Sequence, residues 1–287
     1  MKGIILAGGL GTRLYPATVP VPKCLLPIYD RPMIFFPLST LLQANVRDIL
    51  IITTRRDREA FMRLLGDGSD LGIRISYAVQ DVPRGIADAF LIGEEFIGGD
   101  DVILILGDNI FHSRTIESSL KESIADNEGA TVFGIDVPDP ERFGVIDFDE
   151  NFNVISIEEK PAVPKSNTAA VGLYIYDGNV SEHAKTLKPS PRGELEITDL
   201  NNIYLRDGKL KARQLDGDSV WFDAGTHESL LSASVFVYNI EQAGGKISCP
   251  EKIALEKGYI TPDKLKEIVC DKKSSYYVRI RCECGIR

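Results

Sequence analysis

The chain has 287 residues, with 42 acidic and 33 basic side chains and a formal net charge of −9. This length is enough to bury a full core, as one large α/β domain with or without an appendage. The excess of acidic side chains argues against a basic surface that binds nucleic acid. Any polyanionic ligand must therefore be held by a local cluster of Arg and Lys. Five scattered cysteines do not form a disulfide framework and indicate a reducing compartment.

No secretory leader is recognisable at the start of the sequence, and no apolar run approaches the roughly 18 residues of a membrane span. We therefore expect a cytoplasmic protein that binds neither membranes nor nucleic acid.

The chain opens with an apolar run, Lys2 to Ala7, which predicts a buried parallel strand. Gly8, Gly9 and Gly11 follow directly, and glycines at a strand end let the backbone turn with its amides facing an anion. We interpret this loop as a phosphate site. A tight turn with no ligand is the alternative.

Two cations, Arg13 and Lys23, add side-chain charge to the same loop. The spacing does not fit a Walker loop, because Thr12-Arg13 follows Gly11 where Lys and Ser or Thr are needed. It does not fit a dinucleotide fingerprint either, because Leu14 stands at the third glycine position.

Apolar runs typical of strands alternate with helical patterns through the first half of the chain. The predicted strands cover residues 48–54, 73–79 and 102–106, and the predicted helices cover residues 57–65 and 86–96. This alternation predicts an α/β fold with a mostly parallel, doubly wound sheet. Ligands bind beyond the carboxyl ends of such strands, which is where the glycine loop and the turn at 106–109 both fall.

After about residue 130 the pattern becomes rich in short strands, and from about residue 228 it favours helices. The later predicted strands cover 131–137, 145–148, 154–159 and 170–176, and the later helices cover 228–243 and 262–269. We expect a core at 1–229, with a nucleotide half at about 1–130 and a β-rich half at 131–229 that covers a second ligand. A helical region would follow at 230–287.

Two aspartates are candidate metal ligands. Asp108 follows the apolar strand at 102–106, and a carboxylate at that end of a parallel strand is well placed to hold Mg²⁺ together with phosphate oxygens. Asp223 follows Trp221-Phe222. Either residue alone could be an ordinary turn carboxylate. Two of them opposite a phosphate loop favour metal-assisted phosphoryl or nucleotidyl transfer.

Two further segments are ambiguous from their residues alone. Glu159-Lys160 closes a strand, and could bind a sugar hydroxyl and a second anion or form a solvated ion pair. Gln80 and Gly85 flank a strand-to-helix connection, where an amide side chain could read a base edge or simply be a polar loop residue. Thr198 looks like the N-cap of a helix.

Ten segments together resemble the sugar-1-phosphate nucleotidyltransferases, and most closely the glucose-1-phosphate thymidylyltransferases of bacteria and archaea. Each segment is modest alone, but their joint order and spacing are specific to this family. The resemblance runs from the first strand to about Pro250. The segments are GGLGTRLYPAT, PKCLLP, RPMIFFPLSTL, YAVQDVPRGIADAF, LGDNIF, DPERFGVIDFD, EEKPAVPKSN, GLYIYD, SPRGELEITDLN and WFDAGTHESLL.

The resemblance implies a Rossmann-like core, Mg²⁺ as cofactor, dTTP and α-D-glucose 1-phosphate as substrates, and a homotetramer. The product would be dTDP-glucose, for deoxysugar synthesis such as the rhamnose route. By the same resemblance, Arg13, Lys23, Asp108 and Lys160 would be catalytic, and Asp108 and Asp223 would bind the metal. Gly144, Glu159, Lys160 and a backbone group near Val171 would hold the sugar phosphate. The nucleotide would contact Leu6, Gly8, Gly9, Gly11, Thr12, Arg13, Lys23, Gln80, Gly85 and Asp108.

Arg84 and Asp88 stand where such relatives often carry Asp and Gln. Alternatives to the thymidylyltransferase interpretation are an enzyme that uses UTP or another hexose 1-phosphate, and a regulator that binds nucleotide sugars without turnover. A pure binding module would have little need for the two metal carboxylates.

Overall fold

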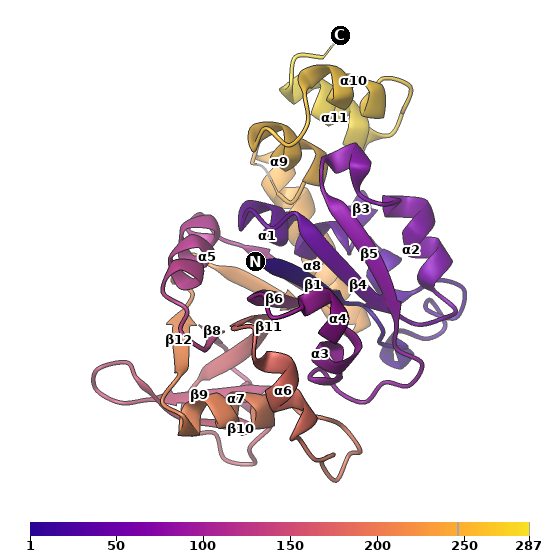
Figure 1. The fold of residues 1–287 in the computed structure, drawn as a ribbon. Coiled ribbons are helices and arrows are strands. Elements are labelled where there is room, and N and C mark those ends of the chain that lie inside the picture. Colours follow the sequence, from indigo (N-terminus) through magenta and orange to yellow (C-terminus); the bar gives the residue numbers. More distant parts are fainter. Residues whose placement is uncertain (246, 287) are drawn as a thin grey trace.

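The centre of the molecule is a parallel sheet whose strands are almost wholly apolar. The structure, a computed structural model, describes residues 1–245 and 247–286. Strands β1 (Lys2–Leu6), β4 (Asp48–Thr53), β5 (Arg74–Val79) and β6 (Val102–Leu106) pair in parallel in the order β6-β1-β4-β5. Parallel strands of this kind are covered on both faces, which is why their sequences lack alternation. The predicted α/β fold with a parallel central sheet is confirmed (Figure 1).

Helices connect these strands, and one of them differs from the prediction. The first-half helices are α1 (Phe35–Gln43), α2 (Arg58–Leu65), α3 (Asp88–Ile92), α4 (Glu94–Ile97) and α5 (Ile116–Ala125). The single helix expected over 86–96 was wrong: it is two short helices, because Gly93 between them has ψ of 6° and leaves the helical conformation. Short 3₁₀ turns lie at Thr12–Leu14, Lys23–Leu25, Ser69–Leu71 and Pro140–Arg142.

The second half extends the same sheet with antiparallel strands. The long strand β11 (Thr168–Tyr176) pairs antiparallel with β6, with β8 (Ala130–Asp136) and with β9 (Gly144–Phe148). Strand β10 (Val154–Glu159) continues from β9, and β12 (Leu210–Gln214) runs parallel to β8. Helices α6 (Val180–Lys185) and α7 (Ile197–Arg206) lie beside these strands. The parallel half and the antiparallel half therefore share one continuous sheet, and each of its two main hydrophobic clusters contains residues of both halves.

A short ribbon apart from the large sheet determines where the two candidate metal ligands lie. Strand β7 (Asn109–His112) pairs antiparallel with β13 (Val220–Asp223), and the register sets Asp223 opposite Asn109. Neither strand was predicted. Their pairing brings the residue after Asp108 next to Asp223, although the two segments are far apart in the chain.

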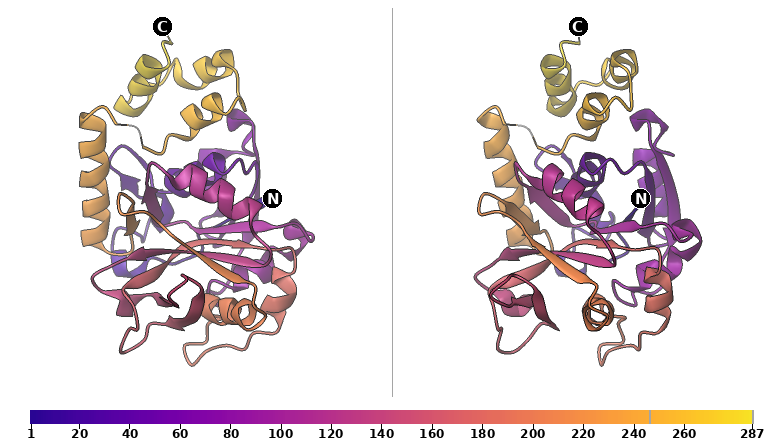
Figure 2. Two further views of the ribbon diagram at one scale, coloured as in Figure 1. Left: turned by 90° about the vertical axis from the view of Figure 1, so that its left-hand side faces the viewer. Right: turned by 60° about the vertical axis from the view of Figure 1, so that its left-hand side comes forward.

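The C-terminal region is helical, as its pattern indicated. It contains α8 (His227–Gln242), α9 (Pro250–Glu256), α10 (Pro262–Val269) and α11 (Ser275–Glu283). In Figures 1 and 2, α9 to α11 gather at the end of the molecule opposite β9 and β10. Helix α8 crosses the division expected at residue 229, which stays a prediction. Among the described helices, none has both the length and the apolar character to cross a bilayer.

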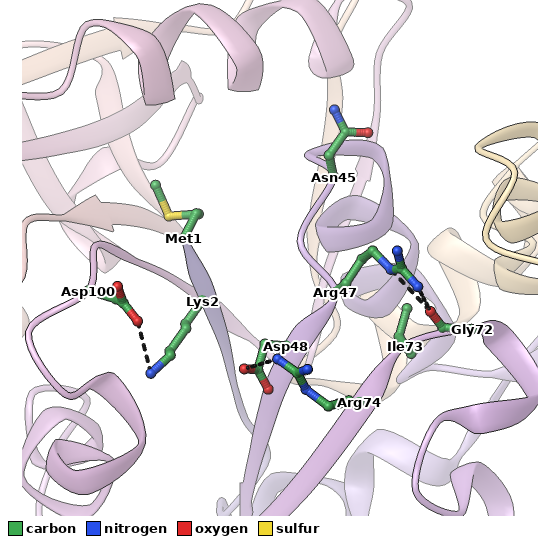
Figure 3. A pocket seen from close by; sticks show the side chains of 9 residues that line it. All are labelled: Met1, Lys2, Asn45, Arg47, Asp48, Gly72, Ile73, Arg74 and Asp100. Atoms are coloured by element: carbon green, nitrogen blue, oxygen red, sulfur yellow. Dashed lines mark hydrogen bonds and ion pairs between the residues drawn. The ribbon is translucent and has the colours of Figure 1, made fainter.

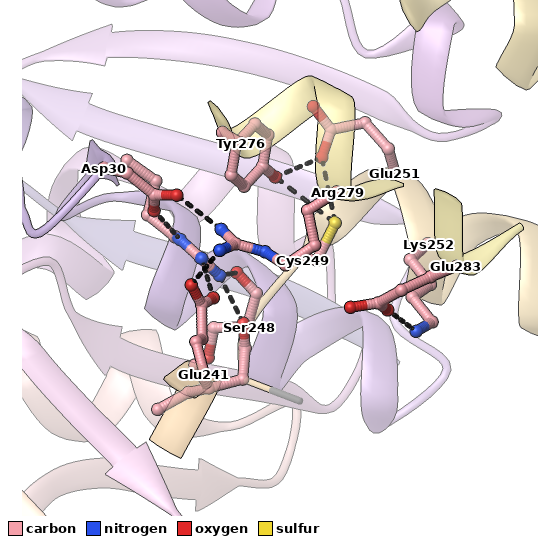
Figure 4. A network of polar contacts seen from close by, with 11 residues as sticks. Asp30, Glu241, Ser248, Cys249, Glu251, Lys252, Tyr276, Arg279 and Glu283 are labelled. Atoms are coloured by element: carbon pink, nitrogen blue, oxygen red, sulfur yellow. Dashed lines mark hydrogen bonds and ion pairs between the residues drawn. The ribbon is translucent and has the colours of Figure 1, made fainter. Parts of the chain in front are cut away.

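A buried network of charges ties the C-terminal helices to the core (Figure 4). Arg31, which is 2% exposed, lies on a hairpin formed by β2 (Pro27–Ile28) and β3 (Arg31–Pro32). Its guanidinium donates to Asp30 at 2.9 Å and pairs with Glu241 at the end of α8. Arg279 on α11 pairs with the same two carboxylates. Two arginines thus neutralise two carboxylates where the β2–β3 hairpin, α8 and α11 meet.

Candidate functional site

A cavity of about 260 Å³ opens at the carboxyl end of β1, where the glycine loop was expected to bind phosphate. Gly11 has φ of +63°, a left-handed conformation that glycine adopts without strain. Arg13 and Lys23 bring two cations to this cavity. The sequence-predicted residues that line it are Leu6, Gly9, Gly11, Thr12, Arg13, Lys23 and Asp108.

A second cavity of about 280 Å³ lies between the ends of β9, β10 and β11 and the β7–β13 ribbon. Arg13, Leu106 and Asp108 line both cavities. The two cavities are therefore adjoining lobes of one site, with a cation and a carboxylate at their junction. The sequence-predicted residues in the second lobe are Arg13, Asp108, Gly144, Glu159, Lys160 and Asp223.

Asp108 and Asp223 differ in their electrostatic surroundings. The ammonium of Lys23 is ion-paired to Asp108. Burial is the largest single influence on Asp108 and favours its neutral form, but the charge of Lys23 and the hydrogen bonds from Lys23 and Asn109 together lower the pKa of the carboxyl. Burial, followed by the negative charge of Asp108, raises the pKa of Asp223. Lys23 and Arg13 oppose that rise only in part. Asp223 is thus a carboxylate short of positive charge.

This donor set fits a hard cation. No group of three or more His, Cys, Asp or Glu that could hold a metal occurs within 1–245 and 247–286. A metal at this junction would therefore take the oxygens of Asp108 and Asp223 and complete its shell with phosphate and water. Mg²⁺ is commonly bound in this way, with one or two protein carboxylates and substrate phosphates.

The end of β10 brings an acid and a base into the second lobe. Glu159 accepts a hydrogen bond from the Thr198 hydroxyl at 2.6 Å, and the Lys160 ammonium lies 3.6 Å from the Glu159 carboxylate. Lys160 has φ of +45°, a conformation that costs a non-glycine residue about 1–3 kcal/mol. The prediction of Thr198 as an N-cap was wrong, because α7 begins at Ile197, which puts Glu196 at the N-cap position, and the Thr198 hydroxyl donates to Glu159 instead.

Four residues of this region carried no assignment in the sequence. Asn109, which is 2% exposed, donates to Asp108 at 3.0 Å, and its Oδ1 accepts from the Trp221 indole at 2.7 Å and from the Gly172 amide at 3.0 Å. Arg142 and Trp221 line the second lobe. Arg192 donates to Glu159 at 3.3 Å. A single Asn, Arg or Trp outside a recognised motif gives no functional signal by itself, so only tertiary structure identifies these residues.

The remaining predicted site residues do not line either lobe. Val171 is fully buried in the core, and its neighbours Ala170 and Gly172 line the second lobe instead. Gln80 is 4% exposed. Gly85 lies against the backbone of Leu195: a Cβ added there would be 2.4 Å from the Leu195 carbonyl oxygen. This position therefore requires glycine for packing, whatever ligand it contacts.

A larger cavity, of about 680 Å³, lies at the opposite rim, at the amino ends of β1, β4 and β5 (Figure 3). Its cations already have partners. Lys2 pairs with Asp100 at 3.0 Å, Arg74 with Asp48 at 2.8 Å, and Arg47 donates to a backbone carbonyl. In open parallel sheets, ligands bind beyond the carboxyl ends of the strands. We therefore assign the functional site to the two joined lobes.

A parallel sheet with a glycine loop, two cations and two carboxylates at its carboxyl rim defines a class of enzymes that transfer nucleotidyl groups. The family model for nucleotidyl transferases matches residues 2–239. The chain belongs to this family and, within it, to the glucose-1-phosphate thymidylyltransferases.

The relatives behind this assignment match nearly the whole chain. A glucose-1-phosphate thymidylyltransferase of Neisseria meningitidis is 55% identical, with 96% of each chain covered. One from Neisseria gonorrhoeae is 58% identical, with 91% of each covered. A Bacillus anthracis structure assigned to the same activity, in complex with sucrose, has a TM-score of 0.78 and 44% identity over 86% of this chain and 100% of its own. A UDP-glucose pyrophosphorylase complexed with UDP-glucose has a TM-score of 0.75 at 26% identity, covering 83% of this chain and 98% of its own.

Proposed function

We propose that this protein transfers a thymidylyl group from dTTP to α-D-glucose 1-phosphate, giving dTDP-glucose and pyrophosphate. The observation that carries the proposal is the pair of lobes that meet at Arg13 and Asp108. A reaction between two phosphorylated substrates needs two adjoining subsites, with opposite charges where the phosphates meet. The named relatives supply the identity of the two substrates.

In this proposal the glycine-loop lobe binds dTTP. Arg13 and Lys23 hold its phosphates, and the loop residues Leu6, Gly8, Gly9, Gly11 and Thr12 surround it. Gln80 and Gly85 contact the base. The support is the coincidence of two cations with a left-handed glycine turn at the end of β1.

The second lobe would bind glucose 1-phosphate. Glu159 accepts hydrogen bonds from sugar hydroxyls, Lys160 pairs with the phosphate, and Gly144 and the backbone near Val171 complete the contact surface. The proximity of Glu159 and Lys160 and the strained φ of Lys160 support this assignment. Strained backbone conformations of this kind cluster at active sites and ligand-binding positions.

Asp108 and Asp223 would hold Mg²⁺, which supplies charge neutralisation on the phosphates when it is bound. The support is that the two carboxylates are close enough for the charge of Asp108 to raise the pKa of Asp223. Chelation and re-addition of the metal test this part separately from the choice of substrates.

The reaction is direct in-line displacement. A phosphate oxygen of glucose 1-phosphate attacks the α-phosphorus, a new P–O bond forms, and the bond from the α-phosphorus to the bridging oxygen breaks as pyrophosphate leaves. Arg13 and Lys23 neutralise the charge on the departing phosphates. Cys24 lines the first lobe, but burial raises its pKa to about 12, so its thiol stays protonated and supports no covalent intermediate.

We also propose a homotetramer. The support is an exposed apolar face on α8, where Leu231, Val235 and Tyr238 are 65%, 49% and 44% exposed at helical spacing. Light scattering coupled to size-exclusion chromatography measures the assembly directly.

The decisive experiment for the activity is pyrophosphate release with dTTP or UTP against a panel of hexose 1-phosphates. The proposal expects the highest kcat/KM for dTTP with glucose 1-phosphate, and measurable use of UTP, because a methyl-sized difference is worth only about 1–3 kcal/mol. Binding without pyrophosphate release would favour a regulator, and a preference for UTP would favour a uridylyltransferase.

A further inference from the structure

Beside the glycine loop, a chain of three polar side chains fixes the orientation of one amide. Gln80 follows β5 and is almost fully buried. Its Nε2 donates to Oδ2 of Asp88 at 2.9 Å, and Nη2 of Arg84 donates to Oδ1 of the same carboxylate at 2.9 Å. The Asp88 side chain is only 1% exposed, whereas that of Arg84 is 60% exposed.

The chemistry of Asp88 dictates which end of the Gln80 amide it faces. An ionised carboxylate only accepts hydrogen bonds, so the amide must turn its NH₂ group toward Asp88 and its carbonyl oxygen away. That oxygen lies over the glycine loop: a Cβ added at Gly8 would be 2.7 Å from Oε1 of Gln80. Because any side chain at residue 8 would clash with this oxygen, Gly8 allows the Gln80 carbonyl to lie against the glycine loop, on the side where the nucleotide is proposed to bind.

We infer that Asp88 is a positioning residue that makes Gln80 present a carbonyl acceptor to the nucleobase. The inference rests on the proposed function, since it concerns the base of the nucleotide substrate. Thymine and uracil carry a ring N–H between two carbonyls, which matches an acceptor flanked by the second amide hydrogen of Gln80. Cytosine carries a ring acceptor and an amino group on that edge, which would require the amide to turn around.

Turning the amide would set Oε1 of Gln80 against the Asp88 carboxylate. Two acceptors cannot bond, and in a buried site the lost hydrogen bond is not replaced by water. The Arg84 guanidinium pairs with the other oxygen of Asp88 but is largely solvated, so the pair contributes little to stability. Asp88 thus discriminates against cytosine without contacting the base.

The backbone holds this loop in place independently of the three side chains. The amide of Leu195 donates to the Arg84 carbonyl at 2.6 Å, and the amide of Ala87 donates to the Leu195 carbonyl at 3.2 Å. Replacing the Asp88 carboxylate therefore removes the orienting group while the main-chain path of the loop is retained.

The test is Asp88→Asn, with kcat/KM measured for dTTP and dCTP at saturating glucose 1-phosphate. An amide at this position can donate as well as accept, so the ratio of dTTP to dCTP use should fall about 10–100-fold. Asp81→Asn is the matched control. It neutralises a neighbouring carboxylate of the same loop, one that is exposed and paired with Arg55, and should leave the ratio unchanged.

A double-mutant cycle separates positioning from a general structural role. If Asp88 acts through Gln80, Asp88→Asn should have no further effect on the ratio in a Gln80→Ala background. An unchanged ratio in Asp88→Asn, or an equal fall in the presence and absence of Gln80, would overturn the inference.

A binding experiment on the wild-type protein does not depend on whether any variant folds. Equilibrium binding of dTTP, dCTP and N3-methyl-dTTP should rank dTTP at least tenfold tighter than the other two, which lack the ring N–H. Equal binding of the three would overturn the inference. These titrations also distinguish it from the proposed function, because base selectivity in binding can hold even if no pyrophosphate is released with glucose 1-phosphate.

Discussion

Asp108→Asn and Asp223→Asn are expected to cost similar activity but to change stability in opposite directions. Each substitution replaces a proposed Mg²⁺ carboxylate with a neutral amide, a weaker ligand for a hard cation. In the folded protein, however, Asp108 is paired with the buried ammonium of Lys23. Asp223 instead is destabilised as an anion by burial and by the charge of Asp108.

The expected magnitudes follow from these contacts. Removing one preorganised electrostatic group commonly costs 10²–10³-fold in kcat, about 2.7–4 kcal/mol of transition-state stabilisation. Asp108→Asn also weakens the hydrogen bond to a charged partner and should cost about 1.5–3 kcal/mol of folding free energy. In a chain of this size that lowers Tm by about 3–12 °C. Asp223→Asn removes an unfavourable buried charge, so its Tm should equal or exceed that of the wild type.

The two carboxylates should also affect folding stability differently as the pH changes. Because folding raises the pKa of Asp223, its cost is fully present above the folded pKa and disappears below the unfolded value of about 3.9. The Tm advantage of Asp223→Asn should therefore shrink on acidification. Because folding lowers the pKa of Asp108, its stabilisation is present above the unfolded pKa and is lost as the pH falls through the folded pKa.

The assays are thermal unfolding without metal or nucleotide, and pyrophosphate release at limiting Mg²⁺. Asp218→Asn, an exposed aspartate on the loop before β13, is the control and should behave as wild type in both. Equal losses of Tm in the two site variants would refute the electrostatic reasoning. Near wild-type kcat at limiting Mg²⁺ would remove that residue from the metal site.

Three further predictions concern the sugar lobe, the metal and the C-terminal helices. Lys160→Ala should raise KM for glucose 1-phosphate more than for dTTP, while Lys165→Ala, which removes an exposed lysine paired with Glu158, should change neither; equal KM increases from Lys160→Ala would place that residue elsewhere. EDTA should stop pyrophosphate release and excess Mg²⁺ should restore it, and activity that survives EDTA would exclude a metal requirement. Arg31→Met should lower the free energy of unfolding by about 3–5 kcal/mol, because it leaves buried carboxylates short of a cation. Urea unfolding measures this loss, and a change under 1 kcal/mol would show that the network is energetically neutral.

The sequence predicted the elements whose apolar pattern is unambiguous. The five apolar residues of β6 and the strand of β10 have the predicted bounds. Helix α1 was not predicted, because its residues are almost all buried and it therefore lacks the one-sided apolar pattern that indicates a helix. Strands β7 and β13 were not predicted, because each is only four residues long and pairs with a segment that is far away in the sequence.

For the site, single residues could be predicted but not their partnerships. Asp108 and Lys23 stood out individually, yet nothing in their spacing shows that they form an ion pair. Asn109 reads as a turn residue, and only tertiary structure shows that its amide joins Asp108 to Trp221. Thr198 has the side chain of a good N-cap, and here the nearby Glu159 competes successfully for its hydroxyl.

The main-chain bonds between Leu195 and residues 84–87 bear on how this enzyme could be re-engineered. The loop that follows β5 is joined to a segment of the second half by two main-chain hydrogen bonds. Apart from Gly85, which any side chain would push against the Leu195 backbone, side-chain exchanges in either segment leave these main-chain bonds intact, whereas insertions or deletions in one segment shift the other. A loop transplanted from a relative to change nucleotide preference must therefore be moved together with its matching stretch around residues 193–197, or the recipient loses the register between its two proposed substrate subsites.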